Sequence, residues 1–270
     1  MIGSYRAVAG LAVAAFLGVS ACSSSAEAAR DTSVTSSHAA EPGTNQVEGT
    51  IVVLAAASLT EAFTTIADQF EADHRDAKVT ISFGPSSGLA QSIIAGAPAD
   101  VFASASVPTM TTVTEAGLAD QPAIFARNVL TIAVPASNPA DIAGVSDLAR
   151  PGVKVAVCQA QVPCGTLAHA VFEAAGIAVT PVTEEADVKG VLTKLELGEV
   201  DAGLVYRTDA IAAGTKVSAI DLPQGPDNGT DYPIVVLRNA PNPAGAAAFA
   251  AYVTSAQGAA VLADDGFGHP

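Results

Sequence analysis

Short apolar segments alternate with segments of helical apolar spacing through most of the chain after residue 50. The first pair is a β-branched apolar run at 51–54 and a predicted helix that begins at Ser58. Ser58 and Glu61 have the spacing of a capping box, in which each side chain bonds the backbone of the other. Such alternation is typical of an α/β protein with parallel sheets.

Further strands and helices follow at regular intervals along the chain. The pattern predicts strands at 79–83, 100–105, 128–135, 154–158, 201–206 and 232–237. It predicts helices at 89–95, 107–116, 166–175, 187–197 and 243–255, and a turn at 84–88. Most of these helices are followed at once by glycine, the residue expected just after a helix C-terminus.

Two loop-rich stretches divide this pattern, one after residue 135 and one before residue 232. We interpret them as two crossings between lobes. Residues 49–128 with 230–270 form the predicted lobe 1, and residues 129–229 form lobe 2. Clefts between such lobes commonly bind small ligands.

The first 21 residues have the pattern of a secretory signal, with one Arg, no acid and an apolar run before Cys22. The tetrapeptide VSAC that ends at Cys22 resembles a bacterial lipobox, in which the Cys carries the lipid; an ordinary signal peptide with a coincidental Cys is the alternative. The apolar run is shorter than the ~20 residues of a spanning helix. Residues 22–48 lack large apolar side chains and are predicted to form a disordered tether. We therefore expect an extracytoplasmic protein anchored to the membrane through Cys22.

Composition and charge narrow the class of protein further. Half of the residues are hydrophobic, yet there is no Trp and only 5% are aromatic, so the core must consist mainly of Ala, Val, Leu and Ile. Removal of the signal changes the formal charge from −15 to −16, because Arg6 is lost. Without a basic patch, nucleic acid is excluded as a partner. The His and Cys residues show no ligand spacing, so we expect no metal site and no cofactor.

The sequence GPSSG at 84–88 matches the GxSxG pattern of a nucleophile elbow, with Ser86 as the nucleophile. A triad would need His169, inside a predicted helix, or His269, the penultimate residue, and no oxyanion loop precedes the serine. A secreted serine hydrolase is therefore kept as a remote alternative, and we predict that the chain is not an enzyme. The favoured hypothesis is that Ser86, like Ser58, offers a hydroxyl and a helix-terminal N–H without reacting. A purely capping role for both serines stays open.

Three more positions share this placement at the ends of strands or the starts of helices. The strand-to-helix pattern recurs at Cys164 and at Val188, and helix N-termini suit anions. Tyr206 ends an apolar strand, so we expect its hydroxyl at the carboxyl edge of a sheet; a packed aromatic with its hydroxyl in solvent is the alternative. Arg207, next to it, is interpreted as a surface residue.

Cys158 and Cys164 bracket the short segment CQAQVPC. In an oxidising extracytoplasmic setting this spacing predicts a disulfide that closes the loop. Two free thiols are the alternative if the Cα atoms lie too far apart.

Several segments together resemble the molybdate-binding proteins of ABC importers, the ModA family, within the type II periplasmic binding-protein fold. They are AAASLTEAF at 55–63, FGPSSGLAQSI at 83–93, AGAPADVFASAS at 95–106, VPCGTLA at 162–168, EADVKGVLTKLELGEVDAGLVYRTDA at 185–210 and YPIVVL at 232–237. The resemblance implies an α/β fold of two lobes, each with a mixed, mostly parallel sheet flanked by helices, joined by two hinge crossings.

The resemblance also implies a ligand and the residues that hold it. The implied donors are the hydroxyl and N–H groups of Ser58 and Ser86, the N–H groups of Cys164 and Val188, and the Tyr206 hydroxyl. The implied ligand is molybdate or tungstate, and the implied partner is an ABC permease; we expect a monomer. Neutral donors suit a fully deprotonated dianion, because hydrogen bonds to a charged group are strong. Sulfate meets the same condition, so the same fold binding another oxyanion is the alternative.

Overall fold

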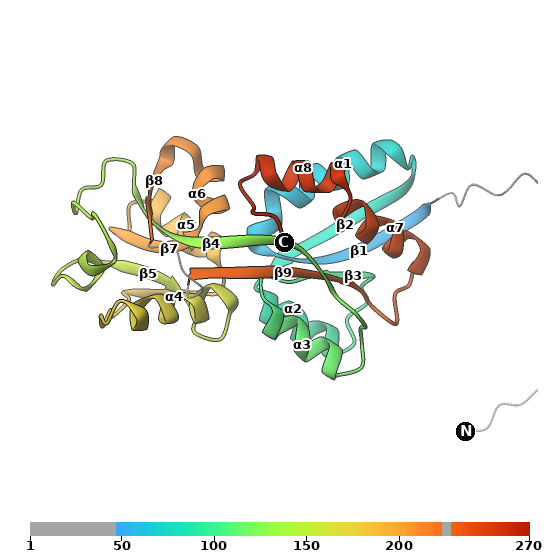
Figure 1. The fold of residues 1–270 in the computed structure, drawn as a ribbon, viewed down its shortest axis with the longest axis horizontal. Coiled ribbons are helices and arrows are strands. Elements are labelled where there is room, and N and C mark those ends of the chain that lie inside the picture. The colour runs from blue at the N-terminus through green and yellow to red at the C-terminus, as the bar shows by residue number, and fades with distance from the viewer. Residues whose placement is uncertain (1–46, 223–227) are drawn as a thin grey trace, which may run out of the picture. The chain divides into compact units, whose positions relative to one another are not determined.

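The computed structural model of the chain describes residues 47–222 and 228–270. The predicted signal peptide, Cys22 and nearly all of the predicted tether lie outside the described residues. The described residues all belong to one compact unit. In it, nine strands join into one mixed sheet with helices packed against it (Figure 1).

The strands are β1 (Glu48–Ala56), β2 (Asp76–Gly84), β3 (Val101–Ala103), β4 (Ala123–Pro135), β5 (Val155–Cys158), β6 (Thr183–Glu185), β7 (Ala202–Tyr206), β8 (Val217–Asp221) and β9 (Gly229–Val236). The α-helices are α1 (Thr60–Asp73), α2 (Ser86–Ile94), α3 (Val107–Glu115), α4 (Pro163–Ala174), α5 (Val188–Glu196), α6 (Arg207–Ala213), α7 (Pro243–Val253) and α8 (Ala256–Asp264). Short 3₁₀ helices are η1 (Ala57–Leu59), η2 (Val145–Ala149) and η3 (Gly214–Lys216).

The strand order is β2-β1-β3-β9-β4-β7-β5-β6, and β8 also pairs with β4. β1 is parallel to β2 and β3, β5 is parallel to β6 and β7, and the pairs made by β4 and β9 are antiparallel. The mixed α/β class is therefore confirmed.

Strand β4 changes partners along its length. Up to Val129 it pairs with β9, and from Leu130 it pairs with β7. We call β1–β3 with α1, α2, α3, α7 and α8 the first half, and β5–β8 with α4, α5 and α6 the second half. Figure 1 shows β4 and β9 running side by side between them. The division into residues 49–128 with 230–270 and residues 129–229 stays a prediction.

Helix α1 shows how the apolar pattern builds the core of the first half. Its buried residues Phe63, Ile66 and Phe70 recur three or four positions apart, which places them on one face of the helix. Phe249 of α7 contacts two of these rings, with centroids 6.2 Å from Phe63 and 5.4 Å from Phe70. This packing holds α1, and the chain just before it, in a fixed position on the sheet.

Two local predictions are wrong, and each has a physical reason. The turn predicted at 84–88 contains a helix start, because α2 begins at Ser86 with Pro85 as its N-cap. The helix predicted from Thr166 begins at Pro163, a residue well suited to the first helical position. The polar residues after Tyr206 begin helix α6, since the Asp209 carboxylate accepts a hydrogen bond from the Tyr206 N–H at 3.3 Å.

In the described residues, no single helix is long and apolar enough to cross a membrane. Helices α7 and α8 meet the length and composition criteria only together, and the chain bends by 57° between them. Phe249 of α7 and Leu262 of α8 are buried in the core of the unit, and this packing accounts for their apolar composition.

Candidate functional site

A small cavity of about 20 Å³ lies where β1, β2, β7 and the starts of several helices converge. All five residues expected to hold an anion line it, although they come from separate stretches of the chain: Ser58, Ser86, Cys164, Val188 and Tyr206. A cavity needs roughly 10–15 Å³ to hold a single water, so this space is small and its lining residues lie close together. The sequence-predicted residues are therefore brought together at one place.

Four of the five positions lie at the start of a helix. Ser58 lies in η1, Ser86 begins α2, Cys164 is the second residue of α4, and Val188 begins α5. The first N–H groups of a helix have no acceptor inside it, and they carry the positive end of the helix dipole. The cavity therefore has the elementary features of an anion site.

The cap of α5 leaves one donor for the cavity. The Asp187 carboxylate accepts hydrogen bonds from the N–H groups of Lys189 and Gly190, at 3.0 and 3.1 Å. The carboxylate therefore caps the second and third N–H groups of the helix, and the N–H of Val188, the first, is not among the groups it binds. This arrangement directs one backbone donor toward a ligand while keeping the helix capped.

Ser58 is not the helix cap that its spacing to Glu61 predicts. Its side chain makes no capping bond, α1 begins two residues later at Thr60, and the Glu61 carboxylate binds Lys189. The Ser58 hydroxyl lies 2.8 Å from the hydroxyl of Tyr232, and both groups are buried. If Tyr232 donates, the Ser58 proton is available to a ligand. The tertiary contacts of both side chains thus replace the predicted capping box.

Ser86 has a similar arrangement with a different partner. Its Oγ accepts a hydrogen bond from the backbone N–H of Ala105 at 3.0 Å, which leaves the hydroxyl proton free to be donated. No hydrogen bond joins Ser86 to a histidine in the described residues, and His169 is exposed on α4. The geometry that a serine nucleophile requires is therefore not formed here.

Tyr206 carries the strongest sign that the cavity holds a ligand. Its side chain is buried, and its hydroxyl makes no well-aligned hydrogen bond in the described part of the chain, although the nearby Tyr232 hydroxyl acts to lower its pKa. Burial, and then the negative charge of Asp209, raise the pKa of Tyr206, so the hydroxyl keeps its proton. A buried polar group without a partner is rare in folded proteins. A ligand that accepts a hydrogen bond from the Tyr206 hydroxyl would satisfy this buried group.

The start of α4 is held by a covalent bond and by a close backbone approach. A disulfide joins Cys158 to Cys164, with the Cα atoms 5.7 Å apart. A Cβ atom on Gly165 would lie 1.9 Å from the carbonyl oxygen of Gln159, so only glycine fits there. These constraints fix the direction of the Cys164 N–H.

Asp187 is the one charged residue among the described residues that line the cavity, and the other charged groups lie behind its wall. No Lys or Arg is among the described residues that line it. Behind it, the Lys189 ammonium binds the carboxylates of Glu61 and Asp209 at 2.8 and 3.0 Å. Burial raises the pKa of Asp209 to about 6, although Lys189 acts in the opposite direction.

Sequence reasoning missed four residues that support the site: Tyr232, Lys189, Asp209 and Gly165. The partners Ser58 and Tyr232 are 174 residues apart, and Glu61 and Lys189 are 128 residues apart. Local sequence patterns do not indicate contacts between residues so far apart in the chain. Only Gly165 carries a local signal, since a glycine next to a helix start often marks a close backbone approach.

Comparison with known proteins defines the class. The chain belongs to the bacterial extracellular solute-binding proteins, whose family model matches residues 51–268. Within that class it belongs to the ModA family, as the resemblance predicted. It is 44% identical over 229 residues to the molybdate-binding protein ModA of Mycobacterium tuberculosis H37Rv, covering 84% of this chain and 88% of that one. It is 33% identical to the molybdate-binding protein ModA of Escherichia coli K12, covering 82% and 89%.

Solved structures confirm the fold. The periplasmic molybdate-binding protein of Azotobacter vinelandii matches with a TM-score of 0.73 and 21% identity, over 82% of this chain and 99% of that one. The sulfate-binding protein SubI of Mycobacterium tuberculosis H37Rv also matches with a TM-score of 0.73, at 22% identity, over 82% and 86%. The type II periplasmic binding-protein fold is therefore the fold of this chain.

Proposed function

We propose that this chain binds molybdate or tungstate in the cavity between two lobes and delivers the dianion to an ABC permease outside the cytoplasm. One observation carries the proposal. Five residues from five separate segments line one small cavity, and all of them offer hydrogen-bond donors. The relatives named as molybdate-binding proteins support the choice of ligand.

The donor set fits a fully deprotonated dianion. The hydroxyl protons of Ser58, Ser86 and Tyr206 and the helix-terminal N–H groups can all point to one centre. Each hydrogen bond to a charged group contributes ~1.5–3 kcal/mol, so several together can offset the lost hydration of the ion. A protonated oxyanion would also need an acceptor, and none of the five proposed groups is a carboxylate; Asp187, the carboxylate among the described lining residues, uses Oδ1 to cap its own helix.

Ligand binding and lobe closure become one event in this proposal. Ser58 and Ser86 come from lobe 1, and Cys164, Val188 and Tyr206 come from lobe 2. A dianion that accepts hydrogen bonds from both lobes stabilises the closed arrangement and adds little to an open one. Cys22 would carry the lipid that keeps the protein at the membrane, beside its permease.

Calorimetric titration tests the ligand directly. We expect tight binding of molybdate and tungstate, and weak binding of sulfate and phosphate at the same ionic strength. Thermal unfolding should shift in parallel, because a ligand at 100 times its dissociation constant stabilises the folded state by about 2.7 kcal/mol. If neither molybdate nor tungstate binds, the proposal fails. If excess sulfate displaces molybdate readily, the same fold serves sulfate instead.

Two further measurements address the anchor and the remote alternative. Cell fractionation should place the wild-type protein with the membrane and release Cys22→Ser into the soluble fraction; equal distribution of the two would exclude the anchor. A fluorophosphonate probe should leave Ser86 unlabelled. Covalent labelling of Ser86 would favour the serine hydrolase.

A further inference from the structure

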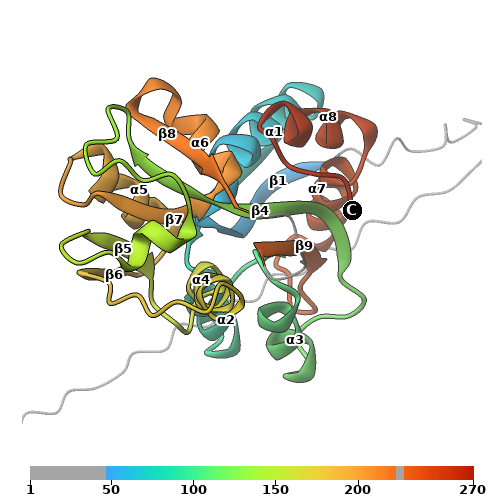
Figure 2. The same ribbon diagram turned by 60° about the vertical axis from the view of Figure 1, so that its left-hand side comes forward.

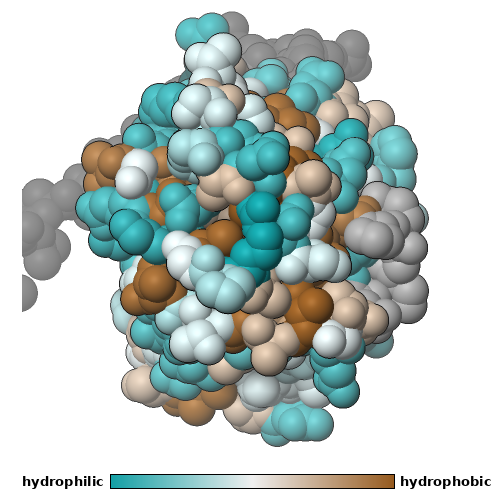
Figure 3. All heavy atoms as spheres, turned by 90° about the vertical axis from the view of Figure 1, so that its left-hand side faces the viewer, coloured by the Kyte–Doolittle hydropathy of each residue, from teal (hydrophilic) through white to brown (hydrophobic). Residues whose placement is uncertain are grey.

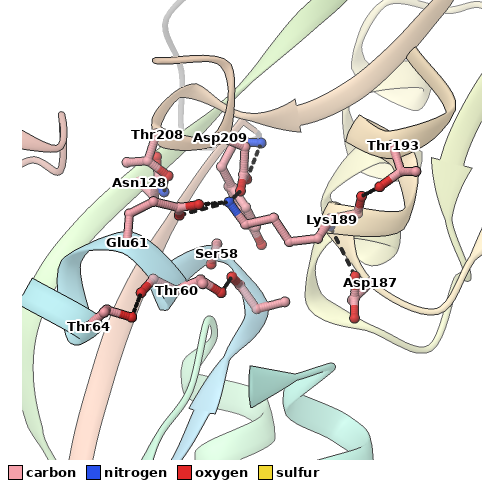
Figure 4. A network of polar contacts seen from close by, with 12 residues as sticks. Ser58, Thr60, Glu61, Thr64, Asn128, Asp187, Lys189, Thr193, Thr208 and Asp209 are labelled. Carbon is pink, nitrogen blue, oxygen red and sulfur yellow. Dashed lines mark hydrogen bonds and ion pairs between the residues drawn. The ribbon is translucent and has the colours of Figure 1, made fainter. Parts of the chain in front are cut away.

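One charged contact joins the two halves beside the anion cavity. The ammonium of Lys189, on α5 of the second half, lies 2.9 and 2.8 Å from the two carboxylate oxygens of Glu61, on α1 of the first half. Figure 4 shows the Lys189 side chain extending across to Glu61, with Asp209 beside it. Lys189 directly follows Val188, whose N–H is one of the proposed donors, so the Lys189–Glu61 contact is next to the site.

The same ammonium also supports Tyr206. Lys189 Nζ lies 3.0 Å from Oδ1 of Asp209, and Oδ2 of Asp209 accepts the hydrogen bond from the Tyr206 N–H. A carboxylate buried as fully as Asp209, with 0% of its side chain exposed, needs a charged partner. One side chain therefore connects Glu61 in the first half with the backbone of Tyr206, a residue that lines the cavity.

The surroundings of Lys189 are acidic. A second cavity of about 100 Å³ lies behind the first and shares Ser58 with it; Glu61 and Asp265 are among its other lining residues. Burial, and then Glu61 and Asp264, raise the pKa of Asp265, whereas Lys189 lowers it. Lys189 is thus the cation that offsets the carboxylates packed behind the anion site.

The opposite side of the site lacks such a contact. There a groove of about 650 Å³ runs between α2 and α3 of the first half and α4 of the second. Figure 2, turned so that the second half comes forward, draws α4 in front of α2. No charged residue is among the described residues that line this groove. Among the ion pairs of the described residues, the one that joins the two halves is therefore Lys189–Glu61.

We infer that Lys189 is a positioning residue for the oxyanion: it ties the first half to the second through Glu61 and holds Tyr206 in place through Asp209. This inference rests on the proposed function. Two other roles make different predictions. A lysine that only attracts the anion at long range acts through its charge, and a lysine that only stabilises the fold changes the melting temperature and not the affinity.

Glu61→Gln distinguishes these three roles, because each predicts a different change in molybdate affinity. The substitution removes the negative charge from the contact between the halves, which leaves at most a neutral hydrogen bond, and it keeps Lys189 charged and paired with Asp209. If Lys189 is a positioning residue, molybdate should bind about five-fold more weakly and dissociate faster, as expected for one partly exposed ion pair. If Lys189 only attracts the anion, loss of the negative charge at Glu61 should tighten binding. If the pair is only structural, the melting temperature falls and the affinity is unchanged.

The chain offers a matched control on the same helix. Lys194 and Glu199 form an ion pair of 2.7 Å inside the second half, with side-chain exposures of 33% and 49%. Those of Lys189 and Glu61 are 25% and 45%. Glu199→Gln should therefore leave molybdate affinity unchanged. Lys189→Arg keeps the charge and should retain most of the affinity, which tests the position without leaving Asp209 unpaired.

The experiment is calorimetric titration of the four proteins with molybdate, together with small-angle X-ray scattering without ligand. Weaker binding by Glu61→Gln alone supports the inference; unchanged or tighter binding overturns it. If the wild type binds neither molybdate nor tungstate, the proposed function has failed, and the scattering decides the inference. Glu61→Gln must then have a larger radius of gyration than the wild type and Glu199→Gln, and equal radii overturn the inference.

Discussion

The two halves of the molecule hold their proposed donors by different physical means. In the first half the supports are neutral: the Ser58 hydroxyl pairs with Tyr232, and the Ser86 Oγ accepts the Ala105 N–H. In the second half the supports are charged or covalent. A disulfide holds the segment that bears the Cys164 N–H, a carboxylate caps the helix that begins at Val188, and the Lys189–Asp209 ion pair lies behind Tyr206.

This difference follows largely from the kind of donor group that each half supplies. A serine hydroxyl both donates and accepts, so one buried neutral neighbour can orient it. A backbone N–H can be oriented only by fixing the chain, which calls for a cap, a cross-link or a buried ion pair. We therefore expect binding in the first half to depend on single hydroxyl groups, and binding in the second half to depend on the chain and on pH.

The largest effect on affinity should come from removing one backbone donor of the second half. Val188 is the first residue of α5, where proline is tolerated, and Asp187 before it has φ −151° and ψ 177°, which proline also permits. Val188→Pro should weaken molybdate binding about 10- to 100-fold, since a hydrogen bond to a charged group contributes ~1.5–3 kcal/mol. Calorimetric titration would measure this. Val188→Ala keeps the N–H and should bind nearly as well; equal losses in the two variants would assign the effect to packing.

The buried charge of Asp209 should appear as a pH dependence of stability. Burial raises the folded pKa to about 6 from 3.8, so the stability that this group contributes is fully present below about pH 4 and is lost as the pH rises through 6. The free energy of unfolding of the wild type, relative to Asp209→Asn, should therefore fall between pH 4 and 7 by on the order of 3 kcal/mol. Urea unfolding at several pH values checks this. A difference independent of pH would contradict it.

The effects of the Ser58–Tyr232 hydroxyl pair on stability and on molybdate binding can be measured separately. Ser58→Ala removes a proposed donor and also one hydrogen-bond partner of the buried Tyr232 hydroxyl, which costs ~1 kcal/mol of stability. Adding Tyr232→Phe should restore most of the melting temperature and none of the molybdate affinity. If the double variant regains binding, Ser58 serves only Tyr232 and the donor role assigned to it is wrong.

The smallest effect on binding should come from the disulfide. Replacing both Cys158 and Cys164 by Ala keeps the Cys164 backbone N–H and removes only the cross-link of a short loop. We expect a loss of about 2 kcal/mol in unfolding free energy and a change in molybdate affinity of less than about five-fold. The reduced wild type should behave like the variant in both measurements. A large loss of affinity would show that the loop alone does not direct the N–H group.

The exposed hydrophobic residues on one face of the second half do not indicate a further docking site. Figure 3 shows this face, where hydrophobic residues form separate small patches among polar ones. The exposed large hydrophobic residues of this half, Val182, Leu197 and Ile211, lie on separate elements or loops. Scattered apolar residues of this kind are ordinary for a protein surface and do not indicate a binding interface.

Local pattern was sufficient to place most elements within a few residues, and it marked the five strand-end or helix-start positions to which the family resemblance then assigned the ligand. Strands β1, β4 and β7 and the start of α5 follow from apolar runs and from capping residues, which act within a few residues of the chain. The same local reasoning failed at Ser58, because the capping-box spacing to Glu61 is equally compatible with tertiary partners. It also gave no sign of α6, which begins at Arg207.

By itself, then, the sequence determined the alternation of strands and helices and the helix starts that converge on one cavity. Only the tertiary structure decided that Ser58 pairs with Tyr232 and that Lys189 joins Glu61 to Asp209. The physical reason is the range of the interactions. Helix starts and strand ends depend on neighbours along the chain, whereas buried hydroxyl and ion pairs depend on which distant segments the sheet brings together.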